Sequence, residues 1–150
     1  MSNPSNLPSF TLFTDGACLG NPGPGGWAYI LRSCDGEIES SGGNSNTTNQ
    51  RMEVTAVLQA LSTLDSPSRV EIYADSQYVT KGLTEWMDGW IAKGWRNAAK
   101  KPVANQDLWQ PLAVLRETHT ITTHWVKGHS GHPENERCDE LASAEAEQLL

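Results

Sequence analysis

Four acidic side chains occupy positions from which they could act together in catalysis. Asp15 and Asp75 each end a predicted strand, and Glu53 and Asp139 each lie near the start of a predicted helix. Four carboxylates in one place would repel each other, because unit charges about 4 Å apart cost about 4 kcal/mol at an effective dielectric constant of 20. An all-oxygen set of ligands favours Mg²⁺ or Mn²⁺ over zinc. Two such ions can activate a water and stabilise the leaving oxygen of a phosphodiester, so the acids predict a metal-dependent hydrolytic site.

Each acid also has an ordinary explanation when it is considered alone. Asp15 precedes Gly16 in a common turn pair, and an acid such as Glu53 near a helix start can complement the helix dipole. Arg51 and Arg137 lie close in sequence, but neither is expected to neutralise the acids. The metal-site hypothesis therefore depends on the four side chains converging.

A histidine supplies a candidate proton carrier. His129 lies in a glycine-containing loop after a predicted strand, and its unperturbed pKa near 6.5 suits proton transfer. An isolated loop histidine is more often structural or inert, so this assignment is weaker than that of the acids. His124, His129 and His132 lack the spacing of a helical pair and no cysteine joins them, so a zinc site is not expected.

Three strands with short connections are predicted to open the chain as an antiparallel meander. They cover residues 10–15, 27–32 and 37–42, with a glycine-rich turn segment at 20–26 and a hairpin at 33–36. Residues 45–49 offer several helix caps, and a helix is expected from there to about Leu64. A fourth strand, 69–75, follows and ends on Asp75. The usual crossover makes the first and fourth strands parallel neighbours, so Asp15 and Asp75 are expected side by side.

The second half of the chain is predicted to be mainly helical. A helix is expected from Gln77 to Trp90 with an interruption at Gly82, and another after Asp107 as N-cap to about Glu117. A fifth strand at 121–126 and a final helix at 134–149 complete the pattern. The fold class is therefore α/β.

Positive charge is concentrated in one segment although the 150-residue chain carries a formal charge of −7. Residues 91–106 hold four basic side chains and no acidic one, and four of the six tryptophans lie in this neighbourhood. Aromatic rings interleaved with cations are typical of nucleic-acid contacts. The alternative is that the tryptophans pack against one another and the charges form a solvated face.

The bulk composition is that of an ordinary globular protein. With 37% hydrophobic residues and no apolar run of about 18, the sequence predicts one domain over residues 1–150 and no membrane partner. Residues 1–8 are polar, lack a signal-peptide pattern and are expected to be flexible. Three scattered cysteines suggest neither a disulfide framework nor zinc, so a reducing cytoplasm is the expected compartment. A monomer is expected because no long apolar seam is left over.

Six ordered motifs closely resemble bacterial type 1 ribonuclease H. The similarity covers residues 10–142 and rests on FTDG at 13–16, NPGPGG at 21–26, TNQRME at 48–53, DSQYV at 75–79, WVKGH at 125–129 and GHPENERCDELA at 131–142. The resemblance implies the ribonuclease H-like fold, with a five-stranded mixed sheet of three antiparallel and then two parallel strands flanked by helices. It also implies Mg²⁺-dependent cleavage of the RNA strand of RNA-DNA hybrids, with Mn²⁺ as a possible substitute.

The resemblance assigns roles to individual positions. Asp15, Glu53, Asp75 and Asp139 match the metal-binding acids, and His129 matches a mobile histidine that assists proton transfer or product release. Neutral side chains that hydrogen-bond the hybrid in its minor groove, and so can detect a 2′-hydroxyl, match Asn21, Asn49 and Gln77. Thr48 and Asn105 match a pocket for a DNA-strand phosphate. Trp86 matches an aromatic that packs on a DNA sugar. Residues 86–106 correspond to the basic handle, whose candidate contacts are Trp90, Lys93, Trp95, Arg96, Lys100 and Lys101.

Two departures from the family pattern remove positive charge. The handle carries Ala92 and Ala104 where relatives are richer in lysine, and Asn46 stands where an arginine often supports the phosphate pocket. We therefore expect weaker hybrid binding and a shallower salt dependence than in a lysine-rich relative. Two other functions remain open: a nuclease or strand-transfer enzyme of the same fold that acts on DNA, and a catalytically silent hybrid-binding module. The neutral minor-groove set and the handle argue against the first, and the complete set of four acids argues against the second.

Overall fold

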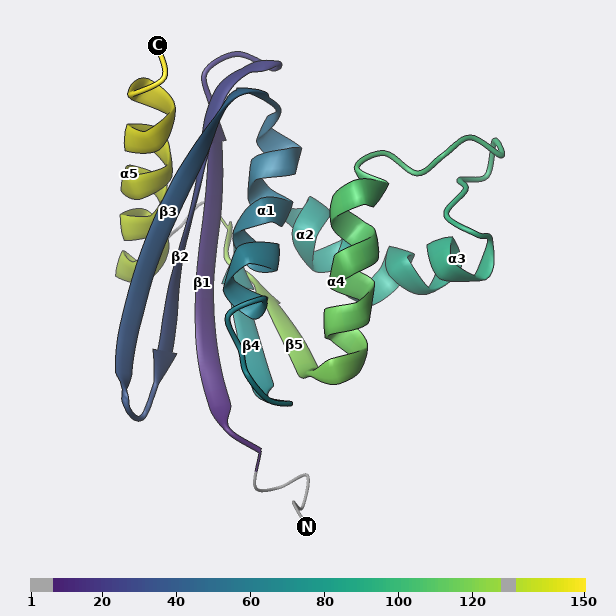
Figure 1. The fold of residues 1–150 in the computed structure, drawn as a ribbon, viewed down its shortest axis with the longest axis horizontal. Coiled ribbons are helices and arrows are strands. Elements are labelled where there is room, and N and C mark those ends of the chain that lie inside the picture. The colour runs from purple at the N-terminus through teal and green to yellow at the C-terminus, as the bar shows by residue number, and fades with distance from the viewer. Residues whose placement is uncertain (1–6, 128–131) are drawn as a thin grey trace.

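A five-stranded mixed sheet forms the centre of the computed structural model, which describes residues 7–127 and 132–150. The strand order is β3-β2-β1-β4-β5 (Figure 1). The strands are β1 (Ser9–Cys18), β2 (Gly23–Ser33), β3 (Gly36–Thr47), β4 (Arg69–Ala74) and β5 (Thr120–Trp125). β1, β2 and β3 pair antiparallel, whereas β4 pairs parallel with both β1 and β5. The predicted sheet and its crossover are confirmed.

Helices cover both faces of this sheet unequally. α1 (Asn49–Leu61) and α4 (Gln106–Thr118) lie on one face, together with α2 (Gln77–Lys81), the π-helix η2 (Gly82–Trp86) and α3 (Met87–Ala92). Of the described helices, α5 (Pro133–Glu147) packs on the opposite face, against β1, β2 and β3 (Figure 1). The candidate acids lie on β1, just after β4, on α1 at one face of the sheet and on α5 at the other face, so a site that holds all of them must combine all three layers.

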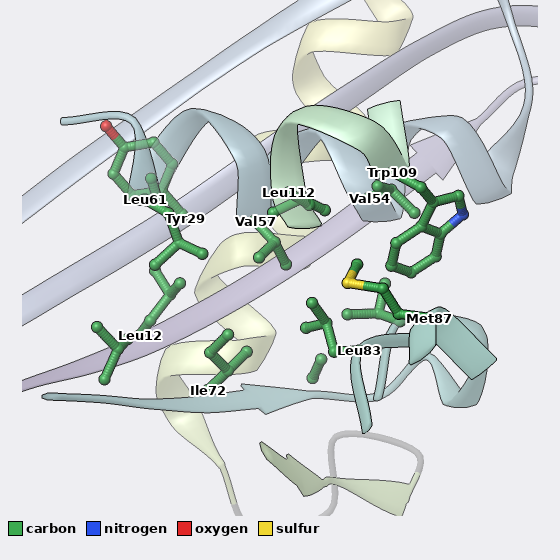
Figure 2. Packing of buried hydrophobic residues seen from close by; sticks show 14 of the residues in the cluster. Leu12, Tyr29, Val54, Val57, Leu61, Ile72, Leu83, Met87, Trp109 and Leu112 are labelled. Carbon is green, nitrogen blue, oxygen red and sulfur yellow. The ribbon is translucent and has the colours of Figure 1, made fainter. Parts of the chain in front are cut away.

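The larger core lies between the sheet and the α1–α4 layer. Leu12 and Ile72 from the strands pack with Val57 from α1 and Trp109 from α4 (Figure 2). Gly82 is required by this packing, because a Cβ atom there would lie 2.3 Å from the Trp109 ring. The predicted interruption at Gly82 is instead a π-helical turn, a feature often found at functional sites.

β1 extends beyond Asp15, which corrects the expectation that the strand ends there. Its parallel pairing with β4 stops at Phe13↔Tyr73, whereas its antiparallel pairing with β2 continues to Cys18↔Gly25. The glycine-rich segment expected to be a turn supplies the first residues of β2 and so prolongs this ladder. Asp15 thus lies where β1 still pairs with β2 but no longer with β4.

Helix ends follow the predicted caps with two exceptions. The side chain of Thr48, within the expected cap segment 45–49, caps α1, and that of Ser76 caps α2. The assignment of Asp107 as an N-cap was wrong: Asn105 holds that position with φ 60°, and Asp107 lies in the first turn, where it pairs with Arg51. α1 ends at Leu61, three residues earlier than expected.

Within residues 7–127 and 132–150, every helix falls short of the length and hydropathy needed to cross a bilayer.

Candidate active site

Three of the four candidate acids meet where the parallel pairing of the central strands β1 and β4 ends. Asp15 on β1, Glu53 on α1 and Asp75 just after β4 each offer a carboxylate oxygen, and these oxygens lie within 4.8 Å of one another. Asp15 is 2% exposed and Glu53 is 5% exposed, while Asp75 is half-buried. The parallel β1–β4 pair and the close packing of α1 on β1 bring these side chains together, as the sequence predicted.

Gly16 makes the close approach of α1 possible. A Cβ atom at this position would lie 2.5 Å from the backbone nitrogen of Glu53 and 2.6 Å from the carbonyl carbon of Met52. The Gly16 backbone N–H also donates to Asp15 Oδ1 at 2.9 Å. Glycine is therefore required at position 16 so that Asp15 and Glu53 can lie side by side, and not because the chain turns there.

The carboxylates are electrostatically strained. Burial raises the pKa of Glu53 well above its ordinary range, and the charges of Asp15 and Asp75 raise it further. Glu53 Oε2 is buried without a hydrogen-bond partner among the residues that the structure describes. The two arginines near in sequence are engaged elsewhere, Arg51 with Asp107 and Arg137 with Glu39. Both arginines therefore pair with acids outside the cluster.

This arrangement fits a hard divalent cation. All the donors are carboxylate oxygens, two of the side chains are buried, and a cation would relieve both the repulsion and the burial cost of Glu53. Among residues 7–127 and 132–150, neither a cysteine nor a histidine, the ligands that zinc prefers, belongs to this cluster. The donor set therefore suits a hard divalent cation.

The remaining two catalytic candidates are not among these three acids. Asp139 is exposed on α5 and is not one of the three acids whose oxygens lie within 4.8 Å of one another. His129 lies outside the described residues. Their assigned roles stay predictions.

Trp125 is a neighbour of the cluster that the sequence motifs contained but did not single out. Its indole Nε1–H donates to the carbonyl oxygen of Asp75 at 2.9 Å, and the side chain is 48% exposed. The bond holds the backbone from which the Asp75 carboxylate projects. Trp125 ends β5 opposite Ala74, the last residue of β4, and this position could have indicated that it lies next to Asp75.

Two of the three candidate minor-groove residues are direct neighbours. Asn21 Oδ1 accepts a hydrogen bond from the backbone N–H of Asn49 at 3.1 Å, and both residues are exposed. Gln77 is exposed in the first turn of α2, two residues after Asp75. These exposed neutral side chains can contact a ligand. Each lies within a few residues of an acid of the cluster in sequence.

Arg51 connects the two candidate phosphate-pocket residues. Its backbone N–H donates to Thr48 Oγ1 at 3.2 Å, and its Nη1 donates to Asn105 Oδ1 at 3.2 Å. Asn105 Nδ2 in turn donates to the Tyr78 hydroxyl at 3.1 Å. Sequence reasoning missed this link because it joins residues 54 positions apart.

The handle combines packed aromatic rings with exposed cations. The Trp90 ring centroid lies 6.0 Å from that of Trp86, 6.2 Å from Trp95 and 5.3 Å from Trp109. Trp109 is fully buried, whereas Trp86 keeps 38% of its surface exposed. The candidate cations Lys93, Arg96, Lys100 and Lys101 are all exposed. The tryptophans therefore do pack on one another, and the same cluster presents Trp86 and the cations to solvent.

Comparison with known proteins identifies the family. The ribonuclease H family model matches residues 8–147. Ribonuclease H of Agrobacterium fabrum is 58% identical over 131 residues, which are 87% of this chain and 90% of that protein. Ribonuclease H of Polynucleobacter asymbioticus is 53% identical over 148 residues, which are 99% of this chain and 96% of that protein.

Solved structures agree with this assignment. LC9-RNase H1, a type 1 RNase H with the type 2 active-site motif, has a TM-score of 0.85 at 28% identity and covers 100% of this chain and 76% of its own. LC11-RNase H1, solved in complex with an RNA/DNA hybrid, shares the fold with a TM-score of 0.63 at 22% identity, over 93% of this chain and 97% of its own. The chain belongs to the ribonuclease H family, as a bacterial type 1 member and hence a nuclease that hydrolyses phosphodiester bonds.

Proposed function

We propose that this protein is an endoribonuclease that cleaves the RNA strand of RNA-DNA hybrids, leaving 5′-phosphate and 3′-hydroxyl ends. The observation that carries the proposal is the convergence of Asp15, Glu53 and Asp75 within 4.8 Å in a member of this family. Support for the substrate comes from a relative of the same fold, LC11-RNase H1, that was solved with an RNA/DNA hybrid. Removal of RNA primers and R-loops is the cellular role that this activity would serve.

Mg²⁺ is the proposed cofactor, with Mn²⁺ able to replace it. Asp15, Glu53 and Asp75 would hold the metal, and Asp139 would complete the set. Bound divalent ions, two in this proposal, supply activation of the attacking water and stabilisation of the leaving oxygen. The protein's own part is to hold the carboxylates in a fixed arrangement, and His129 is the proposed carrier of the proton.

Substrate discrimination is assigned to neutral side chains and affinity to the handle. Asn21, Asn49 and Gln77 can pair with a 2′-hydroxyl without demanding a charge, which suits the RNA strand. Thr48 and Asn105 are proposed to bind a phosphate of the DNA strand. The handle contacts are Trp86, Trp90, Lys93, Trp95, Arg96, Lys100 and Lys101. A single domain acting as a monomer is sufficient for these contacts.

A cleavage assay with three labelled duplexes tests the proposal. RNA-DNA hybrid, duplex DNA and duplex RNA are incubated with the protein and Mg²⁺, and only the hybrid should be cut. Asp15→Asn should lower hybrid cleavage by about 10²–10³-fold or more, because it removes charge that stabilises the transition state. Asp65→Asn, which changes an exposed acid beyond α1, is the matched control and should keep full activity. Cleavage of duplex DNA, or full activity in Asp15→Asn, would overturn the proposal.

A further inference from the structure

Asn135 is a fully buried amide in the first turn of α5. Its side chain is 0% exposed, although most residues of that turn face solvent. Its Nδ2 group lies 3.0 Å from the carbonyl oxygen of Tyr73 and 3.5 Å from that of Thr14, and donates to both. The amide therefore joins two strands that are 62 and 121 residues away in sequence.

The two carbonyl groups lie directly before the acidic cluster. Thr14 precedes Asp15, and Tyr73 stands two residues before Asp75. The parallel ladder between β1 and β4 ends at the Phe13↔Tyr73 pair, so ladder hydrogen bonds no longer set the distance between the strands where the carboxylates project. Asn135 bridges the strands at the point where their own pairing stops.

Asparagine suits this position chemically. One NH₂ group carries two donors and can serve two carbonyl oxygens at once, which no apolar side chain can do. A carbonyl oxygen that is buried without a partner carries a desolvation cost, so this position favours a side chain that donates two hydrogen bonds. An aspartate of the same shape would place an acceptor against two acceptors.

We propose that Asn135 is a positioning residue for the metal site. By bridging β1 and β4, its amide fixes the separation of Asp15 and Asp75, and it ties α5 to the same point. Asp139 lies four residues further along α5, on the same side of the helix, so the bridge also sets the distance from Asp139 to the other acids. This inference rests on the proposed function, since it concerns the same site.

Asn135→Ala removes the bridge without adding charge and is the main test. Metal affinity is measured on the free protein by titrating Mn²⁺ and following unbound Mn²⁺ by electron paramagnetic resonance. Groups that orient metal ligands typically contribute 10–100-fold in affinity or activity, and we expect a loss in that range. Hybrid cleavage should show kcat reduced by a similar factor and KM for the hybrid within about twofold of the wild type, because the substrate contacts are elsewhere.

Ala142→Gly separates positioning from general loss of stability. Ala142 is fully buried on the same helix and makes no side-chain hydrogen bond, and glycine is less favourable than alanine inside a helix. Circular dichroism is used to check that each variant is folded at the assay temperature. This control should keep wild-type Mn²⁺ affinity and kcat. If Ala142→Gly loses as much Mn²⁺ affinity as Asn135→Ala, the effect is one of stability and the proposal is overturned.

Asn135→Gln provides a second test that does not depend on the first variant folding. It keeps both donors on a side chain one methylene longer, so it should bind Mn²⁺ more tightly than Asn135→Ala but less tightly than the wild type. Wild-type affinity in every folded Asn135 variant would overturn the positioning role while leaving hybrid cleavage intact. Failure of the wild-type protein to cut a hybrid would instead overturn the proposed function, and the Mn²⁺ titration would still decide the role of Asn135.

Discussion

The acidic pocket and the basic handle are built on opposite principles. The pocket collects Asp15, Glu53 and Asp75 from three separate elements and buries two of them. The handle keeps its cations exposed, and its polar contacts are local: Arg96 donates to the Lys100 carbonyl oxygen, and Asn97 Oδ1 accepts from the backbone of Ala99 and Lys101. One site depends on tertiary packing, and the other depends on the charge that a short segment displays.

The difference indicates how each region should respond to change. In the pocket, position decides function, because a shift of about 1 Å can cost 10²-fold in rate. In the handle, each cation adds a separate increment of attraction to phosphates, and geometry matters less. Changes in the pocket should therefore alter kcat, metal binding and stability sharply, whereas changes in the handle should alter hybrid affinity in small steps.

Among the substitutions that test this contrast, Gly16→Ala should have the largest combined effect on stability and kcat. The new methyl group would lie 2.5 Å from the Glu53 backbone nitrogen, so α1 must move away from β1 and carry Glu53 with it. Overpacking of this kind costs about 1–3 kcal/mol, and the displaced carboxylate should lower kcat by about 10²-fold. Thermal unfolding and hybrid cleavage measure the two effects.

Gly89→Ala is the matched control for this substitution. Gly89 is in α3, and a Cβ atom there would have nothing within 4 Å. Alanine in a helix is favoured over glycine by about 1 kcal/mol, so this variant should be slightly more stable and fully active. If Gly16→Ala also kept wild-type stability and kcat, the close approach of α1 would not be what places Glu53.

A second, smaller effect concerns the pH dependence of the metal-free protein. Burial and the charges of Asp15 and Asp75 raise the pKa of Glu53 in the folded state, so the folded protein keeps this proton where the unfolded chain, with an ordinary Glu pKa of about 4.3, has lost it. Stability from Glu53 is then fully present below that unfolded pKa and is lost as pH rises through the raised folded pKa. Denaturant unfolding with a chelator present should therefore show falling stability as the pH rises above about 5.

Glu53→Gln isolates this contribution. Without metal at pH 8, the variant should be more stable than the wild type by about 1 kcal/mol, or roughly 2–4 °C in Tm, because glutamine neither takes up a proton on folding nor buries a charge. Its pH profile should be flatter, and added Mg²⁺ should stabilise it less than the wild type. Glu117→Gln, an exposed acid on α4, serves as control. A Glu53→Gln protein less stable than the wild type at pH 8 would contradict the strained pocket.

The same contrast explains what the sequence could and could not predict. Strand-helix-strand handedness was sufficient to put Asp15 beside Asp75, and the position of Glu53 near a helix start made it a third candidate. The extension of β1 past Asp15 was not predictable from local pattern, because its partner begins in a glycine-rich segment typical of a turn. Glycine was selected there by close packing: a Cβ atom at Gly25 would lie 2.5 Å from the Thr47 side chain.

Contacts between distant residues account for the other failures. Asp107 has the composition of a helix cap, but Arg51 binds its carboxylate and Asn105 takes the cap position. Asn135 lies in a polar stretch that suggests an exposed helix start, and only the assembled sheet shows why it is buried. Local propensity describes each segment correctly, and tertiary contacts then decide which polar residues turn inward.

The smallest effect is expected from adding positive charge at Ala104 in the handle and at Asn46. Asn46 and Ala104 are both exposed. Each new contact with a phosphate should steepen the dependence of log K on log[salt] by about 0.9 on a B-DNA reference, so Asn46→Arg with Ala104→Lys should steepen it by up to twice that amount. Hybrid affinity should rise at low salt while kcat stays near the wild-type value, because neither residue belongs to the acidic cluster.

Asn46→Gln with Ala104→Gln provides the neutral control, since it adds length without charge and should leave the salt slope unchanged. Hybrid binding is measured with catalysis blocked by Asp15→Asn, over a range of salt concentrations. A kcat that changes as much as the affinity would mean that these positions communicate with the carboxylates, and the division between a packed pocket and an additive handle would fail. An unchanged slope in the charged variant would instead show that neither position reaches a phosphate, and that the lost cations do not weaken hybrid binding.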